Sequence, residues 1–191
     1  MQYVLASASP RRKELLQEIL PEFEIVPSAF DEAGVKARSP ARLVRALAKG
    51  KAADVAMRSE HAGKIVLGSD TIVVYGREVL GKPKDEADAR RMLKMLSGKK
   101  HYVYTGVCLA AAQGGVLQQK SAACKTAVYF QELSDEWITE YIASGSPMDK
   151  AGAYGIQDGG LVKKIKGSYS NVVGLPTELV KKMINKAKKQ G

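Results

Sequence analysis

The residues with the clearest chemistry lie at the beginning of the chain, where hydroxyl and guanidinium groups surround an expected helix start. Ser9 fits the N-cap position and Pro10 the first helical position. Arg11 and Arg12 then fall in the first turn, where the positive end of the helix dipole disfavours cations. Unpaired N–H groups, the Ser7 and Ser9 hydroxyls and the two arginines together form a candidate phosphate site. The alternative is that the basic residues lie on a solvated helix face.

Asp70 is a second candidate because it interrupts the most apolar stretch of the chain, residues 65–75. Such a run is typical of a buried strand. A carboxylate inside a buried strand is unfavourable unless a cation, a metal ion or several hydrogen bonds compensate its charge. Asp70 therefore indicates a functional site. The alternative is a bulge over residues 68–70 that exposes the side chain to water.

Two lysines are further candidates for phosphate contacts. Lys82 lies in a run that nearly matches a P-loop, but Pro83 replaces the Ser or Thr that would hold magnesium. We therefore reject the P-loop and keep Lys82 as a phosphate contact. Lys51 lies in the later half of an expected helix over residues 40–57. It either points back toward the candidate phosphate site or lies on the surface.

The stretch over residues 147–160 has neither a helical nor a strand period, and it mixes several kinds of polar group with glycines. Asp149, Lys150 and Gln157 all lie in it. Loops of this composition carry function when a rigid scaffold presents them. The alternative is a plain connector.

The remaining pattern predicts a mixed α/β fold in a single domain over residues 1–191, with a twisted sheet flanked by helices and a cleft between two lobes. Strands are expected over residues 3–6, 23–27, 65–75, 78–80, 101–130 (a hairpin turning at Gly114–Gly115) and 161–165. Helices are expected after Ser9, Ser39, Asp85, Ser134 and Thr177, each acting as an N-cap. Residues 167–176 are expected to form a loop.

The composition excludes several classes of protein. An apolar fraction of 45% in 191 residues is that of an ordinary globular protein, and no window is apolar enough to span a membrane. No signal peptide is visible, so we expect a cytoplasmic location. The two cysteines, Cys108 and Cys124, and the two histidines lack partners at ligand spacing, which argues against a zinc site.

The net charge of +10 raises the question of a nucleic-acid partner. The densest group of lysines lies in the last eleven residues, and its pattern is typical of the solvated face of a terminal helix. No RNA-binding aromatic signature or helix-turn-helix pattern accompanies it. Nucleic-acid binding is therefore not expected, and a polyanionic small molecule accounts for some of the charge equally well.

Four separated stretches, taken together, resemble the Maf family of nucleoside triphosphate pyrophosphatases over essentially the whole chain. They are residues 5–16, 68–73 with 81–83, 96–98 with His101 and Thr105–Gly106, and 149–157 with 171–176. The resemblance implies an α/β fold similar to that of inosine triphosphate pyrophosphatases, with a nucleotide cleft between two lobes and a homodimer. It also implies hydrolysis of a nucleoside triphosphate between the α and β phosphates with a divalent metal ion, Mg²⁺ or Mn²⁺.

The resemblance assigns roles to particular residues. Asp70 corresponds to the family's general base, and with Glu32 it would hold the metal ion, although neighbouring Asp31 could be meant instead of Glu32. The phosphate-binding motif includes Ser7, Ser9, Arg11 and Arg12. The family's polar positions lining the cleft correspond to Lys51, Lys82, Asp149, Lys150 and Gln157. Whether Asp70 activates the attacking water or orients the metal ion is left open.

Within the family, one branch resembles dTTP and UTP hydrolases and another acts on 7-methyl-GTP. Arg12, Thr71 and Gln157 match the first branch at positions associated with that choice. No departure is seen at these three positions. Asp158, where the family more often has glycine, comes nearest to one, and it bears only on the local shape of the loop. The family is also linked to inhibition of septum formation. The competing hypotheses are a nucleic-acid-binding or cell-division regulatory protein without turnover, and a nucleotidyltransferase with a second acceptor.

Overall fold

The computed structural model describes residues 1–189, so residues 190–191 of the predicted domain lie outside the described residues. The strands are β1 (Tyr3–Leu5), β2 (Glu24–Ile25), β3 (Ile65–Tyr75), β4 (Glu78–Leu80), β5 (Lys100–Gln113), β6 (Val116–Phe130) and β7 (Val162–Lys166). The α-helices are α1 (Pro10–Gln17), α2 (Pro40–Ala56), α3 (Glu86–Leu96), α4 (Asp135–Ala143), α5 (Tyr169–Val173) and α6 (Thr177–Lys188). Short 3₁₀ helices are η1 (Ser59–His61), η2 (Ser146–Asp149), η3 (Ala151–Ala153) and η4 (Ile156–Asp158). No helix in the described chain is long and apolar enough to cross a membrane.

Four of the five predicted N-caps are confirmed. Ser9, Ser39, Asp85 and Ser134 each accept a hydrogen bond from the backbone N–H three residues later. These bonds satisfy N–H groups that a helix start leaves without a partner, so the local sequence fixes where the helices begin.

Two predictions near the C-terminus are wrong. The expected loop over residues 167–176 contains α5, whose five residues are too few to show a periodic apolar face. Thr177 is the first residue of α6, and Pro176 occupies the N-cap with φ −70° and ψ 93°. The fixed φ of proline is compatible with this extended N-cap, so a side-chain cap is not needed to start the helix.

The strands of residues 1–189 form one seven-stranded sheet in the order β2-β1-β3-β5-β6-β7, with β4 paired to β3. β1 is parallel to β2 and β3, whereas β4 is antiparallel to β3 and β7 is antiparallel to β6. Gly114 and Gly115, with φ of 57° and 78°, form the two-residue turn that joins β5 to β6. The predicted mixed sheet flanked by helices is confirmed.

Contacts divide the described chain into two compact units. The first contains residues 1–70, 105–124 and the described residues from 174 onward, and the second contains residues 71–104 and 125–173. Three of the four boundaries fall within β3, β5 and β6, and the fourth follows the end of α5. A single domain and a cleft between two lobes stay predictions.

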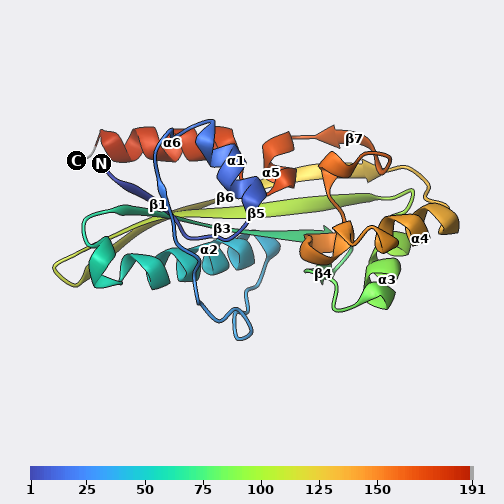
Figure 1. Cartoon of the computed structure of the whole chain (residues 1–191), viewed down its shortest axis with the longest axis horizontal. Coiled ribbons are helices and arrows are strands. Elements are labelled where there is room, and N and C mark those ends of the chain that lie inside the picture. Colours follow the sequence, from blue (N-terminus) through green and yellow to red (C-terminus); the bar gives the residue numbers. More distant parts are fainter. Residues whose placement is uncertain (190–191) are drawn as a thin grey trace. The chain divides into compact units, whose positions relative to one another are not determined.

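Helices cover both faces of the strands in the first unit (Figure 1). Successive side chains of a strand point to opposite faces, so Leu5 and Leu67 pack with α1 and α6. Their neighbours Val4 and Val66 pack instead against α2. Because helices cover both faces, the side chains on both faces of these strands are apolar, and the strands form continuous apolar runs in the sequence.

Helix α2 lies unusually close to the sheet because two glycines face it. A Cβ atom at Gly68 in β3 would lie 2.4 Å from the carbonyl oxygen of Ala48, and one at Gly106 in β5 would lie 2.1 Å from that of Val44. Neither distance can accommodate a side chain. The two glycines therefore set the height of α2 above β3, and with it the position of Lys51.

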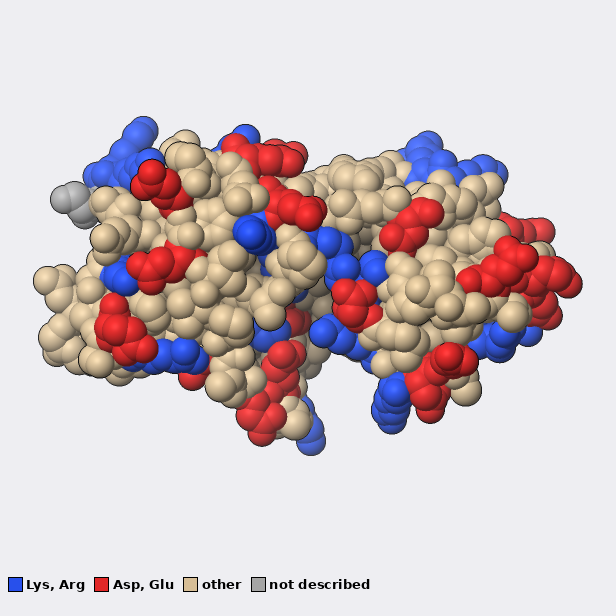
Figure 2. Space-filling model, in the orientation of Figure 1, with Lys and Arg blue, Asp and Glu red and all other residues tan. Residues whose placement is uncertain are grey.

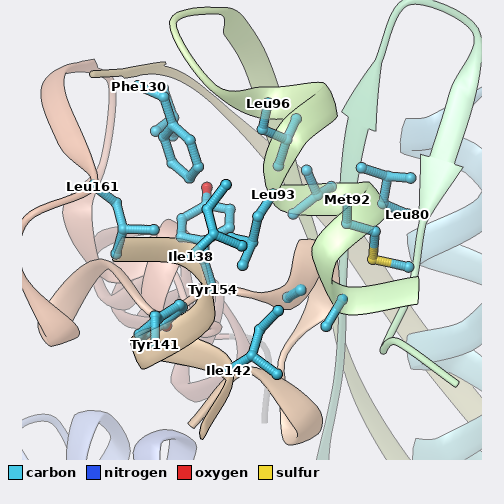
Figure 3. Close-up of a cluster of buried hydrophobic side chains, with 14 of the residues drawn as sticks. Leu80, Met92, Leu93, Leu96, Phe130, Ile138, Tyr141, Ile142, Tyr154 and Leu161 are labelled. Atoms are coloured by element: carbon cyan, nitrogen blue, oxygen red, sulfur yellow. The ribbon is translucent and has the colours of Figure 1, made fainter. Parts of the chain in front are cut away.

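The second unit has its own apolar core, in which α3 and α4 pack on the strands (Figure 3). His101 is fully buried beside this core, with Nε2 2.8 Å from the Tyr154 hydroxyl and its ring edge-on to Phe130. Burial lowers the pKa of His101 to about 4, so the ring is neutral at pH 7. Tyr154, drawn at the centre of Figure 3, thereby anchors the segment over residues 147–160 to the core.

The close approach of α2 predicts that Gly106→Ala destabilises the protein. The added methyl group would overlap the backbone of Val44, which cannot rotate away as a side chain can, so we expect a loss of about 3 kcal/mol in the free energy of unfolding. Urea unfolding measures this loss. Gly34→Ala is the control, because a Cβ there would meet no atom within 4 Å. Equal stability of the two variants would contradict the close packing of α2.

Candidate active site

Asp70 is buried in the middle of β3 with 7% of its surface exposed. Its Oδ1 lies 2.5 Å from Nζ of Lys51, which α2 presents from above the strand. The same Nζ lies 2.9 Å from Oε1 of Glu32. The strand is continuous through Asp70, so the alternative of a bulge that exposes the carboxylate is wrong. The charge of Asp70 is instead compensated by the ammonium group of Lys51, whose side chain is 15% exposed.

The environment of Asp70 raises the pKa of its carboxyl group. Burial raises its pKa above the ordinary value, the charges of Lys51 and Arg12 oppose this shift, and the charge of Glu32 adds to it. The effect of burial is the largest, so the pKa is raised overall. A carboxylate with a raised pKa accepts a proton more readily than a surface aspartate does.

Arg12 is held at the start of α1 by hydrogen bonds. Its Nε donates to the carbonyl oxygen of Gly174 at 3.0 Å, and Nη1 donates to Oγ of Ser7 at 3.3 Å. Oγ of Ser7 also accepts from the backbone N–H of Ser9 at 3.2 Å. Ser7, Ser9 and Arg12 therefore form one cluster, and Arg11 follows Pro10 in the same helical turn. Burial lowers the pKa of Arg12, and the charge of Asp70 opposes this shift.

Sequence reasoning missed the groups that connect this cluster to β3. Oγ of Ser69, which is fully buried, lies 3.2 Å from the carbonyl oxygen of Gly174 and 3.0 Å from that of Gly106. The carbonyl of Gly174 thus accepts from both Arg12 and the residue before Asp70. Both positions lie in stretches that carry the family resemblance, but a backbone carbonyl leaves no signal of its role in the sequence.

The structure distinguishes Glu32 from its neighbour Asp31. Oδ1 of Asp31 accepts a hydrogen bond from the N–H of Ala33 at 2.9 Å and so closes a local turn. Glu32 is the acidic residue that reaches Lys51. Of the two lysines in the later half of α2, Lys51 points to the carboxylates and Lys49 is exposed.

Asp70 and Glu32 could together supply two carboxylate ligands to a divalent metal ion. Among residues 1–189, no group of three or more His, Cys, Asp and Glu side chains could hold a metal ion alone. Magnesium in nucleotide enzymes is commonly bound by one or two carboxylates together with substrate phosphates. Two carboxylates that both contact the single ammonium group of Lys51 provide that donor set.

The other predicted residues belong to the second unit. Lys150 and Asp149 form an ion pair of 3.0 Å, whereas Gln157 and Lys82 are exposed and Thr71 is half-buried next to Asp70. The carbonyl oxygen of Gly81 accepts a hydrogen bond from the N–H of Gly152 at 2.9 Å. The segment that carries Lys82 is thereby joined to the one that carries Asp149 and Lys150.

Known proteins are similar to this chain over most of its length. The sequence model of the family described as Maf-like protein matches residues 2–187. A protein of Geotalea uraniireducens named dTTP/UTP pyrophosphatase is 52% identical over 176 residues, which cover 91% of this chain and 88% of that protein. A protein of the same name from Geobacillus sp. is 49% identical over 177 residues, with 92% of each chain covered.

Two solved structures have a similar fold. The Ham1 protein of Staphylococcus aureus matches with a TM-score of 0.51 and 12% identity, covering 98% of this chain and all of that one. A HAM1 protein from Coxiella burnetii matches with a TM-score of 0.54 and 14% identity, covering 97% and 99% of the two chains. At these identities the match concerns the fold alone.

The buried ion pair predicts that Lys51→Met destabilises the protein more at pH 7 than at pH 4. Without Lys51, Asp70 keeps a buried charge at pH 7, and we expect a loss of about 3 kcal/mol in the free energy of unfolding. The pKa of Asp70 is already raised in the folded state and would rise further in the variant. The folded variant therefore takes up a proton before the unfolded chain does, and the loss shrinks as the pH falls through the folded-state pKa.

Urea unfolding at the two pH values measures the difference. Lys49→Met is the matched control, since it removes the same charge from an exposed site on the same helix. A loss in Lys51→Met that is the same at both pH values, or no greater than in the control, would contradict the ion pair's role.

Proposed function

Because the chain belongs to the Maf family, we propose that it hydrolyses nucleoside triphosphates between the α and β phosphates and releases a nucleoside monophosphate and pyrophosphate. The observation that carries the proposal is the buried carboxylate of Asp70, paired with Lys51 and subject to the charge of Arg12. We propose dTTP and UTP as the principal substrates, since the relatives of about 50% identity are named dTTP/UTP pyrophosphatase. Such an activity would serve to remove unwanted nucleotides from the cellular pool.

The start of α1 is the proposed binding site for the triphosphate. Ser7, Ser9, Arg11 and Arg12 place hydroxyl and guanidinium donors at the positive end of the helix dipole. The negative charge of the triphosphate would neutralise the two arginines, which are otherwise unfavourable at the start of a helix. Lys51 and Lys82 are proposed to add point charges that hold the phosphates without a fixed hydrogen-bond geometry.

Asp70 is the proposed general base. Water would attack the α-phosphorus and give a proton to the Asp70 carboxylate as the new P–O bond forms. The bond from the α-phosphorus to the bridging oxygen breaks, and pyrophosphate leaves with its electron pair. The raised pKa of Asp70 supports this role, because a carboxylate with a raised pKa accepts a proton more readily than a surface aspartate does.

A Mg²⁺ or Mn²⁺ ion is proposed as the cofactor, with Asp70 and Glu32 as its protein ligands. When bound, the ion would neutralise the negative charge that builds up on the phosphate oxygens. Lys51, which contacts both carboxylates, would keep them together before the nucleotide binds.

Base preference is proposed to depend on Arg12, Thr71 and Gln157, as the resemblance implies. Asp149 and Lys150 are proposed to line the nucleotide site with Gln157. The alternative substrate, 7-methyl-GTP, is not favoured, because the relatives at about 50% identity carry the dTTP/UTP name. A homodimer is a further proposal that rests on the family resemblance. A cytoplasmic location is also proposed, and it rests on the sequence, in which no signal peptide is visible.

A nucleic-acid-binding or septum-regulating protein without turnover is not favoured. On the face drawn in Figure 2, acidic side chains lie among the basic ones. Electrostatic binding of a nucleic-acid backbone requires a continuous basic surface. Despite the net charge of +10, that face does not have one.

A panel of nucleoside triphosphates with Mg²⁺ or Mn²⁺ tests the proposed function. We expect pyrophosphate and monophosphate in equal amounts, with dTTP and UTP giving the highest kcat/KM. Asp70→Asn is expected to lower kcat by about 10²- to 10⁴-fold, the usual contribution of a general base. Asp85→Asn is the control, since asparagine replaces aspartate at an N-cap with little loss. Orthophosphate as the only product, or a near wild-type rate for Asp70→Asn, would refute the mechanism.

A further inference from the structure

Asp158, where the resemblance implies that the family more often has glycine, lies at the centre of a polar network in the second unit. Its Oδ2 accepts hydrogen bonds from the Tyr141 hydroxyl and from Oγ of Ser146, the latter at 2.8 Å. Nζ of Lys150 lies 3.9 Å from the same oxygen. One carboxylate oxygen is therefore shared by side chains from α4, η2 and the residue that follows η2.

Lys150 is engaged by its own segment rather than extended into solvent. Its Nζ donates to the carbonyl oxygen of Ser146 at 2.5 Å, to Oγ of Ser146 at 2.9 Å and to Oδ1 of Asp149 at 3.0 Å. Only 11% of the Lys150 side chain is exposed. An ammonium group has three donors, so these contacts together with Asp158 fix the side chain in one place.

Tyr141 connects the other end of the segment to the same carboxylate. Its ring is stacked on Trp137, with centroids 4.7 Å apart, and its hydroxyl accepts a hydrogen bond from the N–H of Gly155 at 3.0 Å. A Cβ at Gly155 would lie 2.7 Å from Oδ2 of Asp158 and 2.8 Å from Cε of Lys150. The backbone at Gly155 is thus packed directly on the network.

We propose that Asp158 is a positioning residue, which acts through Tyr141 and Ser146 to hold the segment over residues 149–157 in the shape that receives the nucleotide. The proposal rests on the proposed function, since Asp149, Lys150 and Gln157 are its nucleotide-site residues in this segment. The segment has no α-helix or strand, and it contains two glycines, which a chain orders only at high entropic cost. Side-chain hydrogen bonds order the segment before the nucleotide binds. The entropic cost of ordering it is then not subtracted from the free energy of binding.

Asp158 is therefore expected to affect the affinity for the nucleotide and not the hydrolysis step itself. Asp158 is bonded to protein groups on the side of Tyr141 and Ser146, and the proposal does not require it to contact the substrate. Loss of its carboxylate leaves the Tyr141 hydroxyl and Oγ of Ser146 without their shared acceptor and removes the charge next to Lys150. The segment then becomes mobile, KM rises, and kcat changes little because Asp70 is untouched.

Amide hydrogen exchange and steady-state kinetics on the same set of variants test the proposal. We expect Asp158→Ala to speed exchange in residues 149–157 about tenfold or more, with no change in α3, and to raise KM for dTTP and UTP about fivefold or more with kcat within twofold. Tyr141→Phe keeps the ring stacked on Trp137 and should produce the same pattern. Asp135→Ala is the matched control, since it removes an exposed α4 carboxylate that pairs with Lys94. Its exchange and KM should equal those of the wild type.

The double variant Asp158→Ala/Tyr141→Phe should raise KM no more than Asp158→Ala alone, because both changes break one network. Wild-type KM in Asp158→Ala overturns the proposal, whether or not exchange is faster. Additive effects in the double variant also overturn it. Failure of the proposed function would look different, since the wild-type protein itself would then release no pyrophosphate from any nucleotide.

Discussion

The ion pair between Asp70 and Lys51 is the interaction on which the rest of the site depends. A charged carboxylate in the middle of an apolar strand is tolerated only because an ammonium group lies 2.5 Å away, also largely removed from water. That ammonium group is delivered by α2, which can lie so close to the sheet only because Gly68 and Gly106 have no side chain. Backbone packing in the first unit therefore sets the electrostatics of Asp70.

The same constraint explains how the candidate phosphate site is joined to the carboxylate. The carbonyl of Gly174 accepts hydrogen bonds from Arg12 and from Ser69, the residue before Asp70. A shift of β3 would therefore disturb the guanidinium group as well as the carboxylate. In the proposed reaction this rigidity matters, because phosphoryl chemistry depends mainly on positioning and on electrostatic stabilisation.

Most elements and the identity of the key carboxylate could be predicted from the sequence, because their signals are local. Helix caps such as Ser9 and the Gly114–Gly115 turn act within a few residues, and Asp70 stands out against its apolar neighbours. Contacts between distant residues leave no such signal. The convergence of Glu32, Lys51 and Asp70 depends on how α2 packs, and α5 is too short to show a period. The hydrogen bond between Tyr141 and Asp158 joins residues 17 positions apart, so the sequence gives no signal of it.

The central claim is that Asp70 is a buried, ion-paired carboxylate with a raised pKa, suited to accept a proton. A pH titration of its carboxyl ¹³C resonance, assigned by comparison with Asp70→Asn, measures that pKa directly. The structure predicts a midpoint above the ordinary value of 3.8, because the effect of burial exceeds that of Lys51 and Arg12. A midpoint at or below 3.8 would contradict the account, since Asp70 would then be no better a base than an exposed aspartate.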